Sequence, residues 1–117
     1  MKIRRLFLLV VLALSTGTCA SVTPELLAPA LGPEGVTFAY YEPGARSVAV
    51  AGTFNGWAPN EVHMEQDAGV WMVTIPLESG EYPFMYVING EQWITPPKAD
   101  DFVPDGFGQT NGVVIVP

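Results

Sequence analysis

Apolar and polar residues alternate with a period of two through most of the chain after residue 35. Such alternation is typical of strands that bury one face, and residues that favour turns separate the alternating runs. The sequence therefore predicts an all-β fold, an antiparallel β-sandwich of about seven short strands within residues 36–117. The expected strands are residues 36–41, 47–52, 62–64, 70–75, 81–88, 91–94 and 112–116.

The phase of the alternation predicts which side chains face the core. Burying one large apolar side chain stabilises a fold by about 1.5–3 kcal/mol. A set of such residues can therefore fold this domain without disulfides, since the chain has a single cysteine. The predicted core residues are Phe38, Val48, Val50, Trp71, Val73, Ile75, Phe84, Tyr86, Ile88, Val113 and Ile115.

The N-terminal segment has a different pattern. Lys2, Arg4 and Arg5 precede an unbroken apolar run over residues 6–14, and small residues follow it. The run is much shorter than the ~20 residues that a membrane-spanning helix needs. This layout is typical of a bacterial export signal, so residues 1–19 are predicted to be a signal peptide. Residues 20–35, rich in Pro, Ala and Gly, are predicted to be a tether.

Cys19 lies where such a signal would be cleaved, and two interpretations are open. In the first, Cys19 resembles the lipobox cysteine of bacterial lipoproteins, so the protein is held in the cell envelope by a lipid at its N-terminus. Because Ala20 follows, that anchor would favour the outer membrane of a Gram-negative host. In the second, cleavage follows Ala20 and releases a soluble periplasmic or secreted protein.

The charge of the chain excludes one class of partner. Five Lys+Arg face twelve Asp+Glu, giving a net charge of −7, and three of the basic residues lie in the first five positions. The body keeps only Arg46 and Lys98 as basic residues. A surface that acidic repels phosphate backbones, so nucleic-acid binding is not expected.

Residues suited to catalysis or metal binding are sparse. His63 is the only histidine, so a zinc site with several histidine ligands cannot be assembled. We interpret His63, in a short predicted strand, as a surface residue and not as part of a catalytic triad. Asp100, Asp101 and Asp105 cluster among prolines, but their spacing matches no calcium loop, and we interpret the segment as a solvated loop. The sequence predicts a protein that is not an enzyme and needs no metal or cofactor.

Aromatic residues beside turns are the candidate binding residues. Trp57 follows a Thr-Phe-Asn-Gly segment, Trp93 lies just after the Asn89-Gly90 turn, and Phe107 is flanked by glycines. Flat aromatic faces pack against the C–H patches of sugar rings, while amide side chains bond sugar hydroxyls. The alternative is that each indole closes an end of the sandwich as a half-buried plug. The candidate amides are Asn55, Asn60, Gln109 and Asn111.

The segment VAVAGTFNGW at residues 48–57 resembles the signature of carbohydrate-binding module family 48. That family includes the glycogen-binding domain of the AMP-activated protein kinase β subunit and the N-terminal domains of branching and debranching enzymes. The similarity continues through residues 71–77 and 80–90 to Trp93, and closes at residues 110–116. It implies an immunoglobulin-like, early-set sandwich that binds α-1,4-linked glucans such as glycogen, starch or maltooligosaccharides.

The resemblance also implies roles for individual residues. Trp57 and Trp93 match the tryptophans that stack on glucose rings, Phe107 matches an apolar residue that inserts into the curve of the glucan, and Asn111 matches a hydroxyl-binding asparagine. Two positions differ from the family pattern, since Met85 replaces a lysine and Gln109 replaces a threonine.

A second function, of another class, remains open. The same aromatic residues could form the docking patch of an envelope protein–protein interaction module that binds no sugar. Under that interpretation Met85 is expected, because a methionine in place of a lysine makes the surface more apolar.

Overall fold

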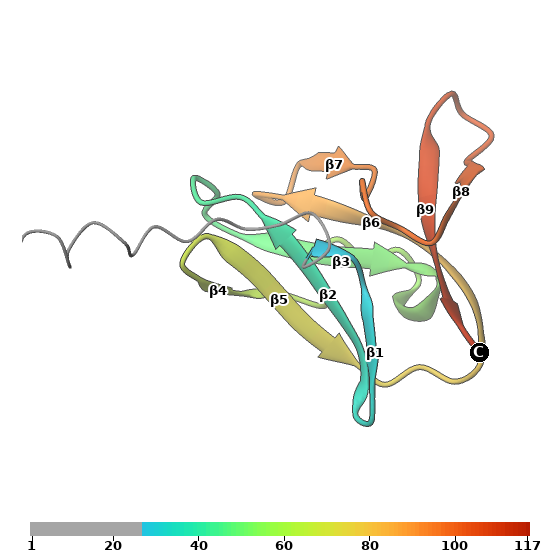
Figure 1. The fold of residues 1–117 in the computed structure, drawn as a ribbon. Coiled ribbons are helices and arrows are strands. Elements are labelled where there is room, and N and C mark those ends of the chain that lie inside the picture. The colour runs from blue at the N-terminus through green and yellow to red at the C-terminus, as the bar shows by residue number, and fades with distance from the viewer. Residues whose placement is uncertain (1–26) are drawn as a thin grey trace, which may run out of the picture.

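The computed structural model describes residues 27–117, which form two antiparallel β-sheets packed face to face (Figure 1). The first sheet has the strand order β1-β2-β5-β4, and the second has the order β3-β6-β9-β8, with β7 paired to β6. The predicted all-β, immunoglobulin-like sandwich is thus confirmed. The strands are β1 (Ala30–Gly32), β2 (Gly35–Tyr41), β3 (Val48–Gly52), β4 (Glu65–Asp67), β5 (Val70–Ile75), β6 (Gly80–Ile88), β7 (Gln92–Ile94), β8 (Asp101–Pro104) and β9 (Thr110–Val116).

The described residues contain nine strands where about seven were predicted. Six of the predicted strands are present, with bounds that agree within two residues. The segment 62–64 forms only an isolated bridge between His63 and Ala49, so the prediction of a strand there was wrong. The additional strands β1, β4 and β8 are short and fully exposed. They carry no alternation of apolar and polar residues, because neither of their faces is buried.

The expected tether is also shorter than predicted at its C-terminal end. Ala30–Gly32 pairs with β2, so the folded part begins before residue 35. The predicted signal peptide of residues 1–19, including Cys19, and residues 20–26 of the tether lie outside the described residues. Among residues 27–117, no helix is long and apolar enough to span a membrane.

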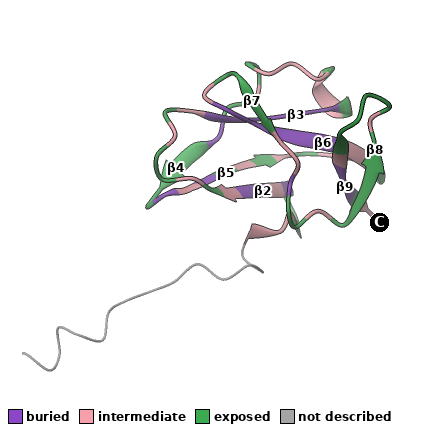
Figure 2. Ribbon diagram, turned by 90° about the horizontal axis from the view of Figure 1, so that it is seen from above, coloured by how far each residue is buried: buried purple, intermediate pink, exposed green. Residues whose placement is uncertain are grey.

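The core between the two sheets contains several aromatic rings. Figure 2 shows that buried residues concentrate in β2, β3 and β6. Phe38 of β2 meets Phe84 of β6 edge to face, with ring centroids 4.9 Å apart. The Tyr86 hydroxyl of β6 donates to the Ala39 carbonyl of β2 at 3.2 Å and so links the sheets inside the core. The Trp71 indole is also buried and donates to the Glu42 carbonyl. These contacts confirm most of the predicted core.

The predicted phase was wrong for strand β9. Val114 packs between the sheets with Val116 against it, whereas Ile115 is 39% exposed. Val113 is buried as predicted, but it lies outside the cluster between the sheets. The C-terminal strand is a continuous apolar run, so its sequence contains no signal that distinguishes one face from the other. Shifting the phase by one residue places Asn111, Val113 and Ile115 on the outer face of the second sheet.

Candidate functional site

The outer face of the second sheet carries the candidate site. Side chains of β6 alternate, so that Phe84 and Tyr86 enter the core while Met85 and Val87 point to the opposite face. The pairing of β3 with β6 places Ala51 beside Met85 and Ala49 beside Val87. Because the side chains of Ala49 and Ala51 are small, they leave a shallow depression on the outer face of the sheet. Larger side chains from neighbouring loops can pack into this depression.

Trp57 lies on that low surface. It packs against Ala49, Ala51 and Val87 and is half-buried. A short 3₁₀ helix (Thr53–Asn55) leads into Gly56, and Trp57 follows in the left-handed region with a φ of 62°. Its backbone N–H donates to the Gly52 carbonyl at 2.9 Å, which closes the loop onto the end of β3. Trp57 therefore lies over the outer face of the sheet and does not plug an end of the sandwich.

Asn55 holds this loop and does not line the site. Its Oδ1 accepts from the Gly52 N–H at 3.0 Å, and its Nδ2 donates to the Val50 carbonyl at 3.1 Å. With both ends of the amide bonded to the backbone, Asn55 is a positioning residue for Trp57. The structure thus separates Asn55 from the other residues that the sequence predicted for the site.

Trp93 reaches the same face from the opposite side. The Asn89-Gly90 turn has φ values of 54° and 75°, as a tight two-residue hairpin requires, and returns the chain as β7. In that hairpin Trp93 lies directly opposite Val87, so both side chains share one face. Trp93 is 38% exposed, which leaves much of its ring open to solvent.

The loop between β8 and β9 supplies the third aromatic residue. Asp105 Oδ1 accepts from the Phe107 N–H at 2.7 Å and from the Gln109 N–H at 3.1 Å, and the Asp105 N–H donates to the Gln109 carbonyl. Phe107 lies at the tip of this loop and is 90% exposed. β8 was expected to be part of a solvated loop. It instead pairs with β9 along its whole length and fixes the base of the tip.

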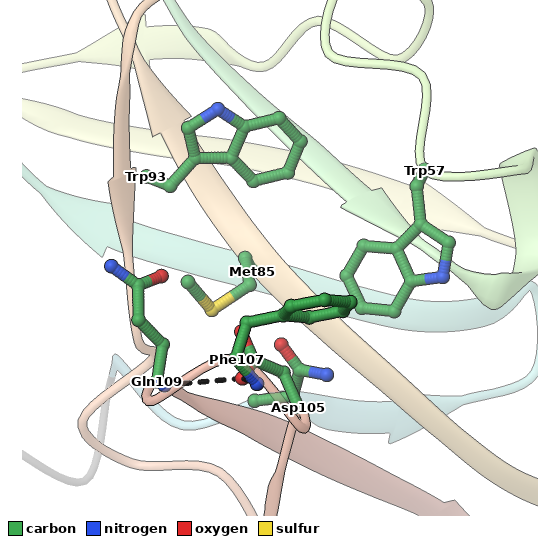
Figure 3. A pocket seen from close by; sticks show the side chains of 7 residues that line it. Trp57, Met85, Trp93, Asp105, Phe107 and Gln109 are labelled. Atoms are coloured by element: carbon green, nitrogen blue, oxygen red, sulfur yellow. Dashed lines mark hydrogen bonds between the residues drawn. The ribbon is translucent and has the colours of Figure 1, made fainter.

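The side chains from these segments surround one hollow of about 390 Å³. Figure 3 shows Trp57 and Trp93 on opposite sides, with Met85 between them and Phe107 close by. Six of the eight residues that the sequence predicted for ligand binding line this hollow, and Asn55 and Asn60 do not. The lining residues are Trp57, Met85, Trp93, Asp105, Phe107, Gln109 and Asn111.

Asp105 is the lining residue that the sequence analysis missed. Its carboxylate had been grouped with Asp100 and Asp101, but the structure separates the three. Asp100 Oδ2 accepts from the Ile115 N–H, and Asp101 Oδ1 accepts from the adjacent Phe102 N–H. The only signal in the sequence was the position of Asp105 two residues before an aromatic residue between glycines, which is typical of a side chain that bonds its own turn.

The chemical character of the site is apolar and hydrogen-bonding. Asp105 is its only ionisable residue, beside the amides of Gln109 and Asn111. His63 lies beside a separate hollow on the first sheet, with Glu65 and Met72. Within residues 27–117, no three His, Cys, Asp or Glu side chains are grouped to hold a metal ion. Three aromatic rings, a thioether, two amides and one carboxylate can bind a ligand with both apolar and hydroxyl surfaces.

Comparison with known proteins identifies the family. The family model for carbohydrate-binding module 48 (Isoamylase N-terminal domain) matches residues 21–99. The chain belongs to carbohydrate-binding module family 48. The match covers Trp57, Met85 and Trp93 but ends before the hairpin that carries Asp105, Phe107, Gln109 and Asn111.

The similar curated proteins are enzymes of which this module matches a small part. A 1,4-alpha-glucan branching enzyme GlgB of Pseudomonas syringae pv. tomato is 42% identical over 72 residues, covering 59% of this chain and 10% of that enzyme. The GlgB 2 enzyme of Rhizobium johnstonii is 39% identical over 93 residues, covering 74% of this chain and 13% of the enzyme. The GlgB of Jannaschia sp. is 39% identical over 71 residues, covering 61% and 10%. The module thus spans about a tenth of the length of these relatives.

Proposed function

We propose that this module is a non-catalytic binding domain for α-1,4-linked glucan, which it holds in the hollow between Trp57 and Trp93. The observation that carries the proposal is the convergence of three aromatic residues from three separate segments on one open hollow. These three aromatic residues are not part of the core between the sheets, because the core cluster packs on the other side of the second sheet.

Aromatic contact provides the apolar part of recognition. A glucose ring presents flat C–H patches, and packing them on an indole removes apolar surface from water. Met85, 4% exposed, forms the floor and offers a polarisable surface without a charge. Phe107 stands free at the loop tip, where it can insert against a curved oligosaccharide. An open, wet site of this kind should bind with a dissociation constant of about 10 μM to 1 mM.

Amide groups provide the orientation. Asn111 lies on the outer face of β9, and Gln109 lies just before that strand. Their amides can donate to and accept from sugar hydroxyls at the rim of the aromatic surface. The similar proteins are 1,4-alpha-glucan branching enzymes, which supports the choice of this sugar.

A titration with maltoheptaose tests the proposal. Tryptophan fluorescence is a suitable readout, because Trp71 is buried in the core and changes therefore report on Trp57 and Trp93. Wild-type protein should give a saturable change with a midpoint between about 10 μM and 1 mM sugar, and cellohexaose, whose linkages are β-1,4, should give little. A flat response at 5–10 mM maltoheptaose, roughly ten times the weakest expected constant, would disprove glucan binding.

The decisive variant is Trp93→Ala. Trp93 is on a short edge strand, so its loss should lower affinity at least about tenfold while changing the free energy of unfolding by less than about 1 kcal/mol. Met72→Ala is the matched control, since Met72 is 45% exposed on the other sheet and outside the hollow. Equal affinities of the two variants for maltoheptaose would contradict the proposed site.

A protein partner is the second candidate, favoured by the exposure of Phe107 beside Phe102 and Val103 on the same hairpin. The two functions separate in a pull-down from envelope extract with and without maltodextrin. Sugar binding at this site predicts that maltodextrin competes with any bound partner, whereas a docking patch elsewhere on the hairpin would be unaffected.

The location of the protein forms part of the same proposal. We assign residues 1–19 to an export signal, with Cys19 as the acylated first residue of an envelope-anchored protein. Mass spectrometry of the mature N-terminus tests this assignment. A diacylglyceryl mass on Cys19 is the expected result, and a free N-terminus at Ser21 would instead show cleavage after Ala20 and a soluble protein.

A further inference from the structure

Among residues 27–117, a single charged side chain, Asp105, lines the glucan-binding hollow, and no basic residue of this part of the chain lines it. Asp105 is half-buried in the lining, and it forms no ion pair with any of residues 27–117. The position where the family resemblance places a lysine holds Met85. The polar character of this site therefore depends on an anionic acceptor instead of a cationic donor.

The two oxygens of this carboxylate have different surroundings. Oδ1 accepts both the Phe107 and the Gln109 N–H, at 2.7 and 3.1 Å. Oδ2 receives no hydrogen bond from any side chain or backbone group in the described part of the chain. One oxygen is thus committed to the loop, and the other remains able to accept from a ligand.

The loop depends on these bonds because little else holds it. Gly106 and Gly108 have φ values of 86° and 93°, and a Cβ on either would meet nothing within 4 Å. Phe107 between them is 90% exposed. The tip therefore has few packing contacts, and the bonds to Asp105 fix where the Phe107 ring is held relative to the hollow (Figure 3).

From this arrangement we propose, building on the function proposed above, that Asp105 determines the charge specificity of the site. Its Oδ2 accepts hydrogen bonds from glucose hydroxyls while Oδ1 holds the Phe107 loop, so the site selects neutral glucan over phosphorylated glucan. Hydrogen bonds to an ionised acceptor are roughly twice as strong as neutral ones. The same charge repels a phosphate monoester that binds beside it.

Affinities for two matched ligands test this proposal. The ligands are maltoheptaose and maltoheptaose carrying one phosphate on a glucose 6-hydroxyl, titrated against full-length wild type, Asp105→Asn and Asp101→Asn. The asparagine at position 105 keeps an acceptor oxygen for the loop and removes the charge. Asp101→Asn is the control, because it removes one charge from the same hairpin at a residue outside the hollow.

Wild type should prefer the neutral sugar by about tenfold. Asp105→Asn should bind maltoheptaose about three- to tenfold more weakly and should reduce the preference to about twofold. Asp101→Asn should match wild type with both ligands. If Asp105→Asn and Asp101→Asn retain the same preference as wild type, the role of Asp105 is overturned, although glucan binding stands. If wild type binds neither ligand, the proposed function itself is overturned.

A salt series on wild type keeps the test independent of the fold of any variant. Raising sodium chloride from 50 to 500 mM should shrink the preference for the neutral sugar several-fold, because screening weakens the repulsion. If the preference for the neutral sugar does not change with salt, it arises from the shape of the site and not from its charge, and the electrostatic proposal is overturned.

Discussion

Trp57 adopts a backbone conformation that is uncommon for a bulky residue. Its φ of 62° follows Gly56 at 67°, and residues held in this region typically cost about 1–3 kcal/mol of backbone strain. Two contacts stabilise this strained conformation. The Asn55 amide forms hydrogen bonds with the backbone of Gly52 and Val50, and the indole packs on Ala49 and Ala51. The position of this ring is therefore set by a neighbour that does not line the hollow.

Replacing Asn55 by Ala should release Trp57. Loss of the amide leaves the Gly52 N–H and the Val50 carbonyl without their partner, which should lower the free energy of unfolding by about 1–2 kcal/mol. Maltoheptaose affinity should fall at least about fivefold, because the indole no longer has a fixed place. Denaturant unfolding and sugar titration measure the two effects. The exposed Asn60→Ala serves as the control, and unchanged affinity in Asn55→Ala would refute its positioning role.

Tyr86 forms a buried hydrogen bond within the core, in which its hydroxyl donates to the Ala39 carbonyl. Burial raises the pKa of this hydroxyl well above its ordinary value. The folded protein therefore keeps this proton at pH values where the unfolded chain loses it. Because the unfolded state then binds fewer protons, the free energy of unfolding must fall as pH rises above about 10.

Tyr86→Phe should lower the free energy of unfolding at pH 7 by about 1 kcal/mol, through loss of the bond to Ala39. It should also reduce the alkaline loss of stability, which for one proton amounts to about 1.4 kcal/mol per pH unit. The free energy of unfolding of the variant should still decrease somewhat with pH, because burial also raises the pKa of Tyr40, and the charge of Glu42 adds to this effect. Urea unfolding from pH 7 to 11 measures both effects. Parallel curves for variant and wild type would contradict the assignment to Tyr86.

At the scale of elements, β9 links the core to the site. Its Val114 packs inside the sandwich, while Asn111 faces the hollow on the other side. Gly112 lies between them where Pro96 and Ala99 cross the strand. A Cβ at Gly112 would approach Pro96 Cγ to 2.4 Å and Ala99 Cβ to 2.8 Å. Only a residue without a side chain allows the segment after β7 to cover β9 this closely.

Gly112→Ala should destabilise the module by about 1–3 kcal/mol, since the new methyl group overpacks a buried contact. Thermal or denaturant unfolding measures the effect. Gly44→Ala is the matched control, because nothing lies within 4 Å of a Cβ at that loop position. Equal stability of the two variants would show that the 96–99 segment can move away without cost.

At the scale of the whole molecule, residues 27–117 form the sandwich core and a candidate site on the outer side of one sheet. The two loops at this site are fixed by hydrogen bonds to their own backbone. Such a site is largely formed before the ligand arrives, which reduces the ordering cost of binding.

A chain of residues 27–117 should therefore unfold in one cooperative transition and bind maltoheptaose within about twofold of the full-length protein. Beginning the chain at Pro33 removes β1 and leaves the edge of β2 unpaired, so that shorter chain should be less stable with the same affinity. Calorimetry and sugar titration on both chains measure these quantities. Loss of binding in the 27–117 chain would show that residues before it contribute to the site.

Much of this molecule could be predicted from local patterns in the sequence. Apolar runs bounded by turn residues predicted six strands, and the phase of the residues within them predicted the inner faces of β2, β3, β5 and β6. The Asn89-Gly90 pair predicted the hairpin that carries Trp93, because few residues tolerate a positive φ. Position beside turns, together with the family resemblance, gave six of the residues that line one hollow.

The remaining features were decided by contacts between distant segments. Which side chains of β9 face the core depends on its pairing with β6, because the apolar run of β9 places apolar residues on both faces of the strand. Strands β4 and β8 are exposed on both faces, so only their hydrogen-bonded partners make them strands. Contacts between distant segments also explain why Asn55, which was predicted to bind ligand, holds a loop, whereas Asp105, which was not, lines the hollow. Whether a polar side chain serves the backbone or remains free for a ligand depends on which groups the folded chain brings within hydrogen-bonding distance.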